Sequence, residues 1–320
     1  MGKDITKNLV GQPIFKQIIK MLPREQFDIL VKQCGSDRYY KTLFSWEQLM
    51  IMLFGIFSRC DSMGEVCDGM RALSGKLSYL GMDCAPSKST AGDALRDRSE
   101  ELFRLYYFAL IAYFRPLLSV SRKEKVSFEE FYAFDSTTIT LFSQVMKGVG
   151  RDPKGDGKKK GGLKVHMLTD VHADTAIFAK ISEAKMHDKK FLAHLNPGKG
   201  SMLVFDKAYN FYQQFAQWTE EGVNFVCRLK DNAKVQLQEV LFEKTLQKEE
   251  SGVYKVEHIH LEYKKDKRPE ILCLRLVYYK DEQGRKYKFI TNNWEISPEE
   301  VALIYKYRWT IELTFKKLKQ

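Results

Sequence analysis

The sequence predicts an α/β protein, with a core of alternating strands and helices that carries a β-rich insertion and follows an α-helical N-terminal domain. Helical patterns fill the first third of the chain, short apolar strands then alternate with helices, and β-branched and aromatic runs follow. Such alternation of strands and helices is typical of an α/β core. We expect a helical domain at 1–120, the first part of the core at 121–232, the insertion at 233–291 and a closing helix at 292–320.

Local signals mark several helices in the N-terminal domain. A capping-box pattern that begins at Ser45 precedes the apolar run Leu49–Phe57. Ser87 can cap another helix, and a longer helix is expected to stop at Pro116. A bundle of short helices either binds DNA or has no role in nucleic-acid recognition, and the pattern does not separate these alternatives.

Two apolar strands of the expected core have the same form. Phe131–Phe134 is followed by Asp135, and Met202–Phe205 is followed by Asp206. In open α/β sheets, ligands bind at the C-terminal edge of the strands. An aspartate there can instead cap the next turn. However, a carboxylate that follows four apolar residues is expensive to bury without compensation, so both are candidate cation ligands.

The closing helix supplies a third carboxylate. Ser297 and Pro298 mark its start. At about 100° per residue, one face within an arc of about 60° carries four polar residues, which are Tyr305, Arg308, Glu312 and Lys319. Arg308 and Glu312 could form only an ordinary ion pair between helix turns. That alternative does not explain why Tyr305 and Lys319 share the same line.

Composition favours a partner that is a polyanion. The 320 residues carry a net charge of +11, from 52 Lys plus Arg and 41 Asp plus Glu, which suits nucleic acid but also a merely basic protein. The six cysteines lack zinc-like spacing and are expected to be free thiols in a reducing compartment. The apolar runs are shorter than the roughly 20 residues of a membrane span. We therefore expect a cytoplasmic protein without membrane contact.

Three carboxylates brought together repel one another, and a divalent cation is the usual solution. Ligation by oxygen alone suits Mg²⁺ or Mn²⁺ rather than zinc. Two such ions can activate a water or a 3′-hydroxyl for attack on a phosphodiester. Arginine and lysine beside them would hold phosphate groups. These residues together point to phosphoryl transfer on DNA.

The motifs resemble those of transposases of the IS4 family. Tyr305, Arg308, Glu312 and Lys319 match the spacing of that family's YREK signature. The segments around Asp135–Thr137 and Asp206–Tyr209 are similar to its blocks around two catalytic aspartates. The resemblance extends over most of the chain.

The resemblance implies an RNase H-like core with a mixed sheet. In it, Asp135, Asp206 and Glu312 would form a DDE triad that binds two Mg²⁺ ions, with Mn²⁺ as a substitute. Tyr305, Arg308 and Lys319 would contact the DNA of the transposon ends. The implied activity is endonucleolytic cleavage at terminal inverted repeats, followed by strand transfer into target DNA, often by a homodimer. For a bacterial protein of this type, association with the nucleoid would follow from DNA binding.

Further DNA contacts are expected at Lys207 and at Lys164, which ends a loop rich in glycine and lysine, Arg151–Lys164. This loop could instead be a solvated surface segment. The chain stops at Gln320, one residue after Lys319. Two alternatives therefore stand beside an active transposase: a truncated, catalytically weak relative that binds transposon ends without cutting, and an RNase H-like nuclease that does not transpose.

Overall fold

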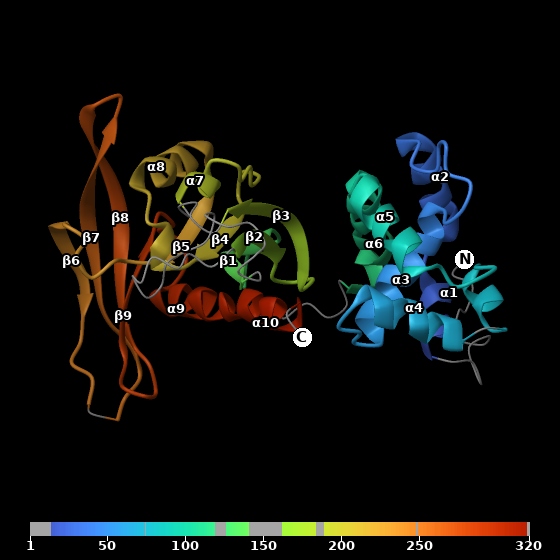
Figure 1. Ribbon diagram of the computed structural model, residues 1–320. Coiled ribbons are helices and arrows are strands. Elements are labelled where there is room, and N and C mark those ends of the chain that lie inside the picture. Colours follow the sequence, from blue (N-terminus) through green and yellow to red (C-terminus); the bar gives the residue numbers. More distant parts are fainter. Residues whose placement is uncertain are drawn as a thin grey trace, which may run out of the picture. The chain divides into compact units, whose positions relative to one another are not determined.

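The computed structural model describes residues 14–73, 75–118, 126–140, 162–183, 189–247 and 249–318. The chain divides into two compact units, Met1–Pro116 and Leu117–Gln320, each of which has its own core (Figure 1).

The first unit is helical, and its core is organised around aromatic rings. Phe27 packs edge-on against Trp46 and Tyr106, with centroid distances of 5.3 and 4.9 Å, contacts that each add about 0.5–1.5 kcal/mol beyond area burial. The elements are α1 (Ile14–Met21), α2 (Arg24–Cys34), α3 (Ser45–Phe57), α4 (Met63–Ala72), the 3-10 helix η2 (Leu77–Leu80), α5 (Lys88–Asp97) and α6 (Glu101–Leu118).

Two helix boundaries in this unit differ from expectation. Phe44, not Ser45, precedes the first turn of α3, because the Glu47 carboxylate accepts the Phe44 N–H at 2.6 Å. The Ser45 hydroxyl donates instead to Asp37 at 2.6 Å. Helix α6 continues past Pro116. A proline in the last turn removes one backbone donor where little helix remains to be disrupted.

In the described residues of the second unit, the structure contains a nine-stranded sheet and five helical segments. The strands are β1 (Phe131–Thr140), β2 (Gly162–Asp170), β3 (Thr175–Glu183), β4 (Met202–Phe205), β5 (Asn224–Arg228), β6 (Gln236–Glu243), β7 (Gly252–Lys265), β8 (Arg268–Lys280) and β9 (Lys286–Thr291). The helical segments are α7 (Lys189–Leu192), η4 (Lys207–Tyr209), α8 (Tyr212–Glu221), α9 (Pro298–Tyr307) and α10 (Trp309–Leu318).

The strand order of the sheet is β3-β2-β1-β4-β5-β9-β8-β7-β6. Strands β3, β2 and β1 are antiparallel neighbours, whereas β4 and β5 run parallel to β1. This mixed sheet, together with the helical first unit, confirms the predicted fold class and agrees with an RNase H-like core. The strands of residues 233–291 extend the same sheet, because β9 pairs antiparallel with β5.

Helices cover both faces of the sheet. Figure 1 shows α7 and α8 on one face and α9 and α10 on the other. Phe215 and Trp218 of α8 belong to the core on the first face. Ile304 of α9 and Ile311 of α10 belong to the core on the second. Among the described residues, no helix is both long and apolar enough to cross a membrane.

The closing helix is two helices rather than one. The predicted start is present, since the Ser297 hydroxyl accepts the Glu300 N–H at 3.1 Å. Helix α9 then ends before Arg308, and α10 begins after it. Arg308 keeps helical dihedral angles, φ −53° and ψ −29°. The backbone therefore turns through the junction almost as a helix would, so residues of α9 and α10 that are three or four apart still lie on the same side.

Replacing Trp218 by alanine is expected to destabilise the second unit by about 3–5 kcal/mol, because a fully buried aromatic side chain would leave a cavity. Native-state hydrogen exchange of the β4 and β5 amides would measure the loss for this unit alone. The matched control is Trp309→Ala, since this side chain is 57% exposed and a surface change is usually worth within about 0.5 kcal/mol. Equal losses in both variants would contradict the assigned core.

Candidate active site

The parallel pairing of β1 and β4 brings two aspartates to one level of the sheet. Phe134 and Phe205 are register partners, and each is followed directly by an aspartate. Asp135 therefore leaves β1 beside the point where Asp206 leaves β4. Each aspartate follows by two residues a member of the core under α9 and α10, which is Ala133 for Asp135 and Val204 for Asp206. Residues two apart on a strand share a face. The two carboxylates thus lie on the face of the sheet that the closing helices cover.

Asp206 combines a structural role with a position in the site. Its carboxylate accepts the Ala208 N–H and so caps η4. The Tyr305 hydroxyl of α9 also donates to it at 3.2 Å. The turn-capping role and the candidate ligand role of Asp206 are therefore compatible.

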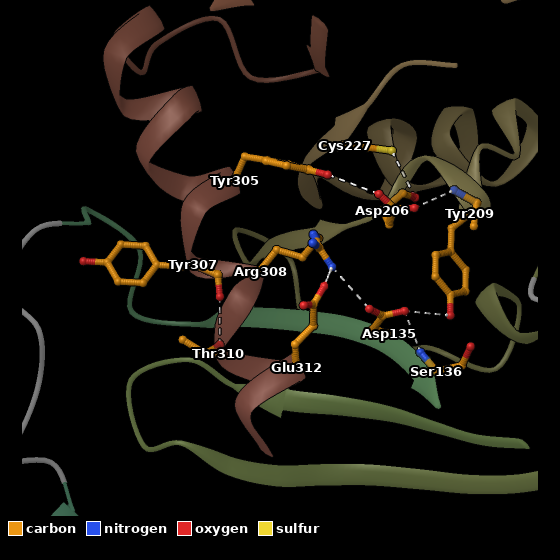
Figure 2. Close-up of polar contacts among 11 residues, drawn as sticks. Asp135, Ser136, Asp206, Tyr209, Cys227, Tyr305, Tyr307, Arg308, Thr310 and Glu312 are labelled. Carbon is orange, nitrogen blue, oxygen red and sulfur yellow. Dashed lines mark hydrogen bonds and ion pairs between the residues drawn. The ribbon is translucent and has the colours of Figure 1, made fainter. Parts of the chain in front are cut away.

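A buried guanidinium joins the other two carboxylates. Arg308 Nη1 lies 3.3 Å from Asp135 Oδ2 and 2.7 Å from Glu312 Oε1. Figure 2 shows that Asp135, Asp206 and Glu312 reach this region from different segments, with Arg308 between the first and the third. Arg308 Nε is buried and has no hydrogen-bond partner among the described residues. The Arg308–Glu312 pair is thus part of a larger charge cluster rather than a pair within the helices alone.

Burial raises the pKa of Asp135 to about 6. The Ser136 N–H at 2.7 Å and the Arg308 guanidinium favour the charged carboxylate and act against this rise. The negative charges of Asp206 and Glu312 add to it. Asp135 is therefore a carboxylate whose negative charge is only partly compensated by the chain itself.

The two neighbours on the closing helices keep their protons. Burial raises the pKa of the Tyr305 phenol above its usual value, so the hydroxyl remains a donor to Asp206. Burial alone would lower the pKa of Arg308, but Tyr305, Glu312 and Asp135 outweigh it and raise that pKa. The site therefore holds a permanent cation beside an under-compensated carboxylate.

The donor set fits a hard divalent cation. All three acidic side chains offer oxygen, which Mg²⁺ prefers, and the raised pKa of Asp135 indicates a local deficit of positive charge. Arg308 lies between Asp135 and Glu312. Shared ligation by these two would require Arg308 to turn away from them.

The lysines predicted to bind DNA have different positions. Lys207 lies next to Asp206 and pairs with Asp231 at 2.9 Å. Lys164 is 2% exposed on β2. Its register places it on the sheet face opposite to Asp135, because the partner of Asp135 is Met167, three residues away. Lys164 is therefore not brought to the acidic site. Lys319 and residues 141–161 of the loop before β2 lie outside the described residues.

The structure also adds a residue that sequence reasoning did not assign to the site. The Tyr209 hydroxyl lies 3.5 Å from Asp135 Oδ1, and its ring packs edge-on against Phe134. In the sequence, Tyr209 stands out only as the last residue of the segment Asp206–Tyr209, which resembles a family block. Its contact with Asp135 depends on η4, which turns the chain back towards β1.

Asp135→Asn is expected to stabilise the chain by about 1–3 kcal/mol at about pH 8 without divalent metal, since the pKa rises from 3.8 to about 6 and each unit corresponds to about 1.36 kcal/mol. Folded protein binds more protons than unfolded protein between these values, so wild-type stability falls as pH rises through this window.

Urea unfolding with EDTA, at about pH 8 and about pH 4, would measure this effect. Below about pH 4 the carboxyl group is protonated in both states, so the advantage of Asn should disappear. A variant that is never more stable than wild type would contradict the assigned burial of charge.

Two protein families match parts of the chain. The family described as "Transposase DDE domain" matches residues 126–320. A family described as "Domain of unknown function (DUF4372)" matches residues 10–83.

Two curated relatives carry the name of a transposase. The y4zB protein of Sinorhizobium fredii (strain NBRC 101917 / NGR234) is 27% identical over 167 residues, which cover 52% of this chain and 46% of that protein. The protein named for insertion sequence element IS5377 of Geobacillus stearothermophilus is 26% identical over 187 residues, which cover 58% and 47%. The aligned part thus spans about half the length of each relative. Because the DDE match covers more than half of the chain, this protein belongs to the family of transposase DDE domains.

Proposed function

We propose that this chain is a DNA transposase of the IS4 type, with Asp135, Asp206 and Glu312 as its catalytic, metal-binding triad. It would cut DNA at terminal inverted repeats and join the freed ends to target DNA. One observation carries the proposal: Arg308 links carboxylates from β1 and α10. The proposal rests on this cluster together with the family to which the chain belongs.

The triad residues would hold two Mg²⁺ ions, with Mn²⁺ as a substitute. When bound, these ions supply an activated water or 3′-hydroxyl and neutralise charge on the phosphate that is attacked. Asp135, which is partly buried and under-compensated, would gain most from a nearby cation.

Arg308 would hold a phosphate next to the triad. Its guanidinium offers several donors in a planar fork, and its Nε has no partner among the described residues. The pairs with Asp135 and Glu312 keep the side chain extended into the site. If a phosphate bound here while metal ions were held by the carboxylates, Arg308 would be free to exchange its carboxylate contacts for contacts to the phosphate oxygens.

Tyr305 would position Asp206 rather than exchange protons with substrate. Its ring packs against Phe289 at 4.5 Å between centroids, and its hydroxyl donates to Asp206. In the YREK pattern, Lys319 completes the set as a further contact to phosphate.

A groove that Tyr305 lines, but none of the three triad residues does, is a further candidate for DNA contact. Its walls come from the β8–β9 hairpin, α9 and α10. Its lining includes the aromatic and basic residues Tyr287, Tyr305, Lys306 and Trp309, and also the acidic Asp281 and Glu282 in the turn. Aromatic and basic side chains in one groove suit stacking and backbone contacts to nucleic acid. We also propose that the helical residues 1–120 contact the DNA of the transposon ends, and that residues 233–291 form a β-rich insertion in the catalytic core. Two copies of the chain would pair two transposon ends as a homodimer.

The full chain is expected to nick DNA that carries the repeats flanking its reading frame only when Mg²⁺ or Mn²⁺ is present. Asp135→Ala should abolish nicking, since it removes a ligand from the reacting centre. Asp231→Ala is the matched control, because this aspartate lies at the surface and pairs only with Lys207 among the described residues.

Each outcome of this gel assay separates one alternative. Nicking that survives Asp135→Ala would overturn the triad. Salt-dependent binding without cleavage would favour a catalytically weak relative. Cleavage without joining of ends would favour a nuclease that does not transpose.

Tyr305→Phe is expected to slow nicking about 10–100-fold, because a hydrogen bond to a charged group is worth about 1.5–3 kcal/mol. The ring and its packing on Phe289 would remain. Tyr263→Phe is the matched control, since Tyr263 lies on β7 opposite Glu270 of β8 and lines neither the triad nor the groove. Single-turnover rates would test this, and equal rates in wild type and Tyr305→Phe would contradict a positioning role.

A further inference from the structure

Strands β7 and β8 bring together two histidines and a cysteine outside the acidic site. Ligand atoms of His258, His260 and Cys273 all lie within 4.8 Å of one another. His258 and His260 are two residues apart on β7, so they share one face of the strand. Cys273 is the register partner of His260 on β8. These three side chains therefore meet on one face of the sheet.

His258 carries an unsatisfied polar atom. Its Nε2 is buried and has no hydrogen-bond partner among the described residues. Leaving a buried polar atom unpaired costs about 1–3 kcal/mol. The ring is held edge-on against Trp294 and His260, with centroid distances of 5.1 and 5.3 Å. A fixed imidazole with an unsatisfied nitrogen is suited to metal ligation.

We propose that His258, His260 and Cys273 bind one divalent cation of borderline softness, of which Zn²⁺ is the representative. Imidazole nitrogen and thiolate are the ligands that Zn²⁺ prefers. With bonds of about 2.0–2.3 Å, tetrahedral ligands lie about 3.3–3.8 Å apart. The ligand atoms now lie within 4.8 Å of one another. Small side-chain rotations would bring them to this separation, since Cys273 is exposed and its thiol is not in a disulfide. The fourth coordination position remains open to water or a carboxylate.

The surrounding charges are compatible with a dication. Glu239 on β6 is the register partner of His258, and Glu262 lies two residues after His260, so both carboxylates share this face. Arg275, the partner of His258 on β8, is the nearby cation. It donates to the carbonyls of Trp294 and Ile296, at 3.3 and 2.7 Å. These hydrogen bonds hold the guanidinium at the loop before α9.

The proposed ion would join β7 to β8 in the part of the sheet that extends beyond the acidic site. Its nitrogen and sulfur ligands differ from the oxygen ligands of the triad, so the two sites select different metals. The inference does not depend on the proposed function, and it can be tested without DNA.

Co²⁺ is the probe for this site, because its thiolate complexes absorb in the near ultraviolet. Titration of the reduced full chain should give a thiolate-to-cobalt band that saturates at one ion per chain and is removed by Zn²⁺. Cys273→Ser should lose the band. Its Zn²⁺ affinity should fall by more than the roughly 10–100-fold that loss of an outer-shell partner causes.

Cys84→Ser is the matched control, since it removes another exposed free thiol, in the helical unit. It should keep the band, as should Asp135→Asn, which alters the acidic site. His260→Gln provides a second ligand variant, and circular dichroism would show that each variant is folded. Absence of the band in wild type, or an equal band in Cys273→Ser, would overturn the proposal.

Discussion

Arg308 compensates negative charge that the fold concentrates on one face of its sheet. Its guanidinium contacts Asp135 from β1 and Glu312 from α10, and those elements are neighbours in the folded chain. Without this cation, packing α10 on β1 would bring two partly buried carboxylates together with no counter-charge. The closing helices can therefore pack on the sheet because they carry the arginine that their own glutamate and the strand aspartate require.

This compensation is incomplete, which has a functional consequence. Burial still raises the pKa of Asp135 to about 6, so a charged carboxylate at this position opposes folding. Active sites often retain such unfavourable groups because ligands restore the balance. A divalent cation would satisfy the charge that Arg308 leaves uncompensated, and Arg308 would then be available to a phosphate. Under the proposed function, stability without metal and chemistry with metal would place opposite demands on the same residues.

The extended sheet separates two kinds of ligand. Around β1 and β4, acidic oxygen atoms face the closing helices. On β7 and β8, imidazole and thiol groups meet on adjacent strands. One continuous sheet holds both, because β9 pairs with β5 and attaches the later strands to the core. Under the two proposals, the same architecture would present a hard-metal site and a softer one without mixing their ligands.

The sequence by itself determined the features that depend on local pattern. Apolar runs placed Asp135 and Asp206 at the level where two strands leave the core. Helical periodicity aligned Tyr305 with Arg308 and Glu312, and this alignment survives the junction at Arg308 because that residue keeps helical dihedral angles.

Tertiary structure decided what depends on register and on contacts between distant segments. A shift of one residue reverses the face of a strand, so only the pairing of β1 with β2 shows that Lys164 lies away from the acidic site. Only the pairing of β7 with β8 joins Cys273 to His260. Local sequence sets which residues share a face of their own strand or helix, whereas the neighbours of that face are chosen by strand pairing and core packing across the whole unit.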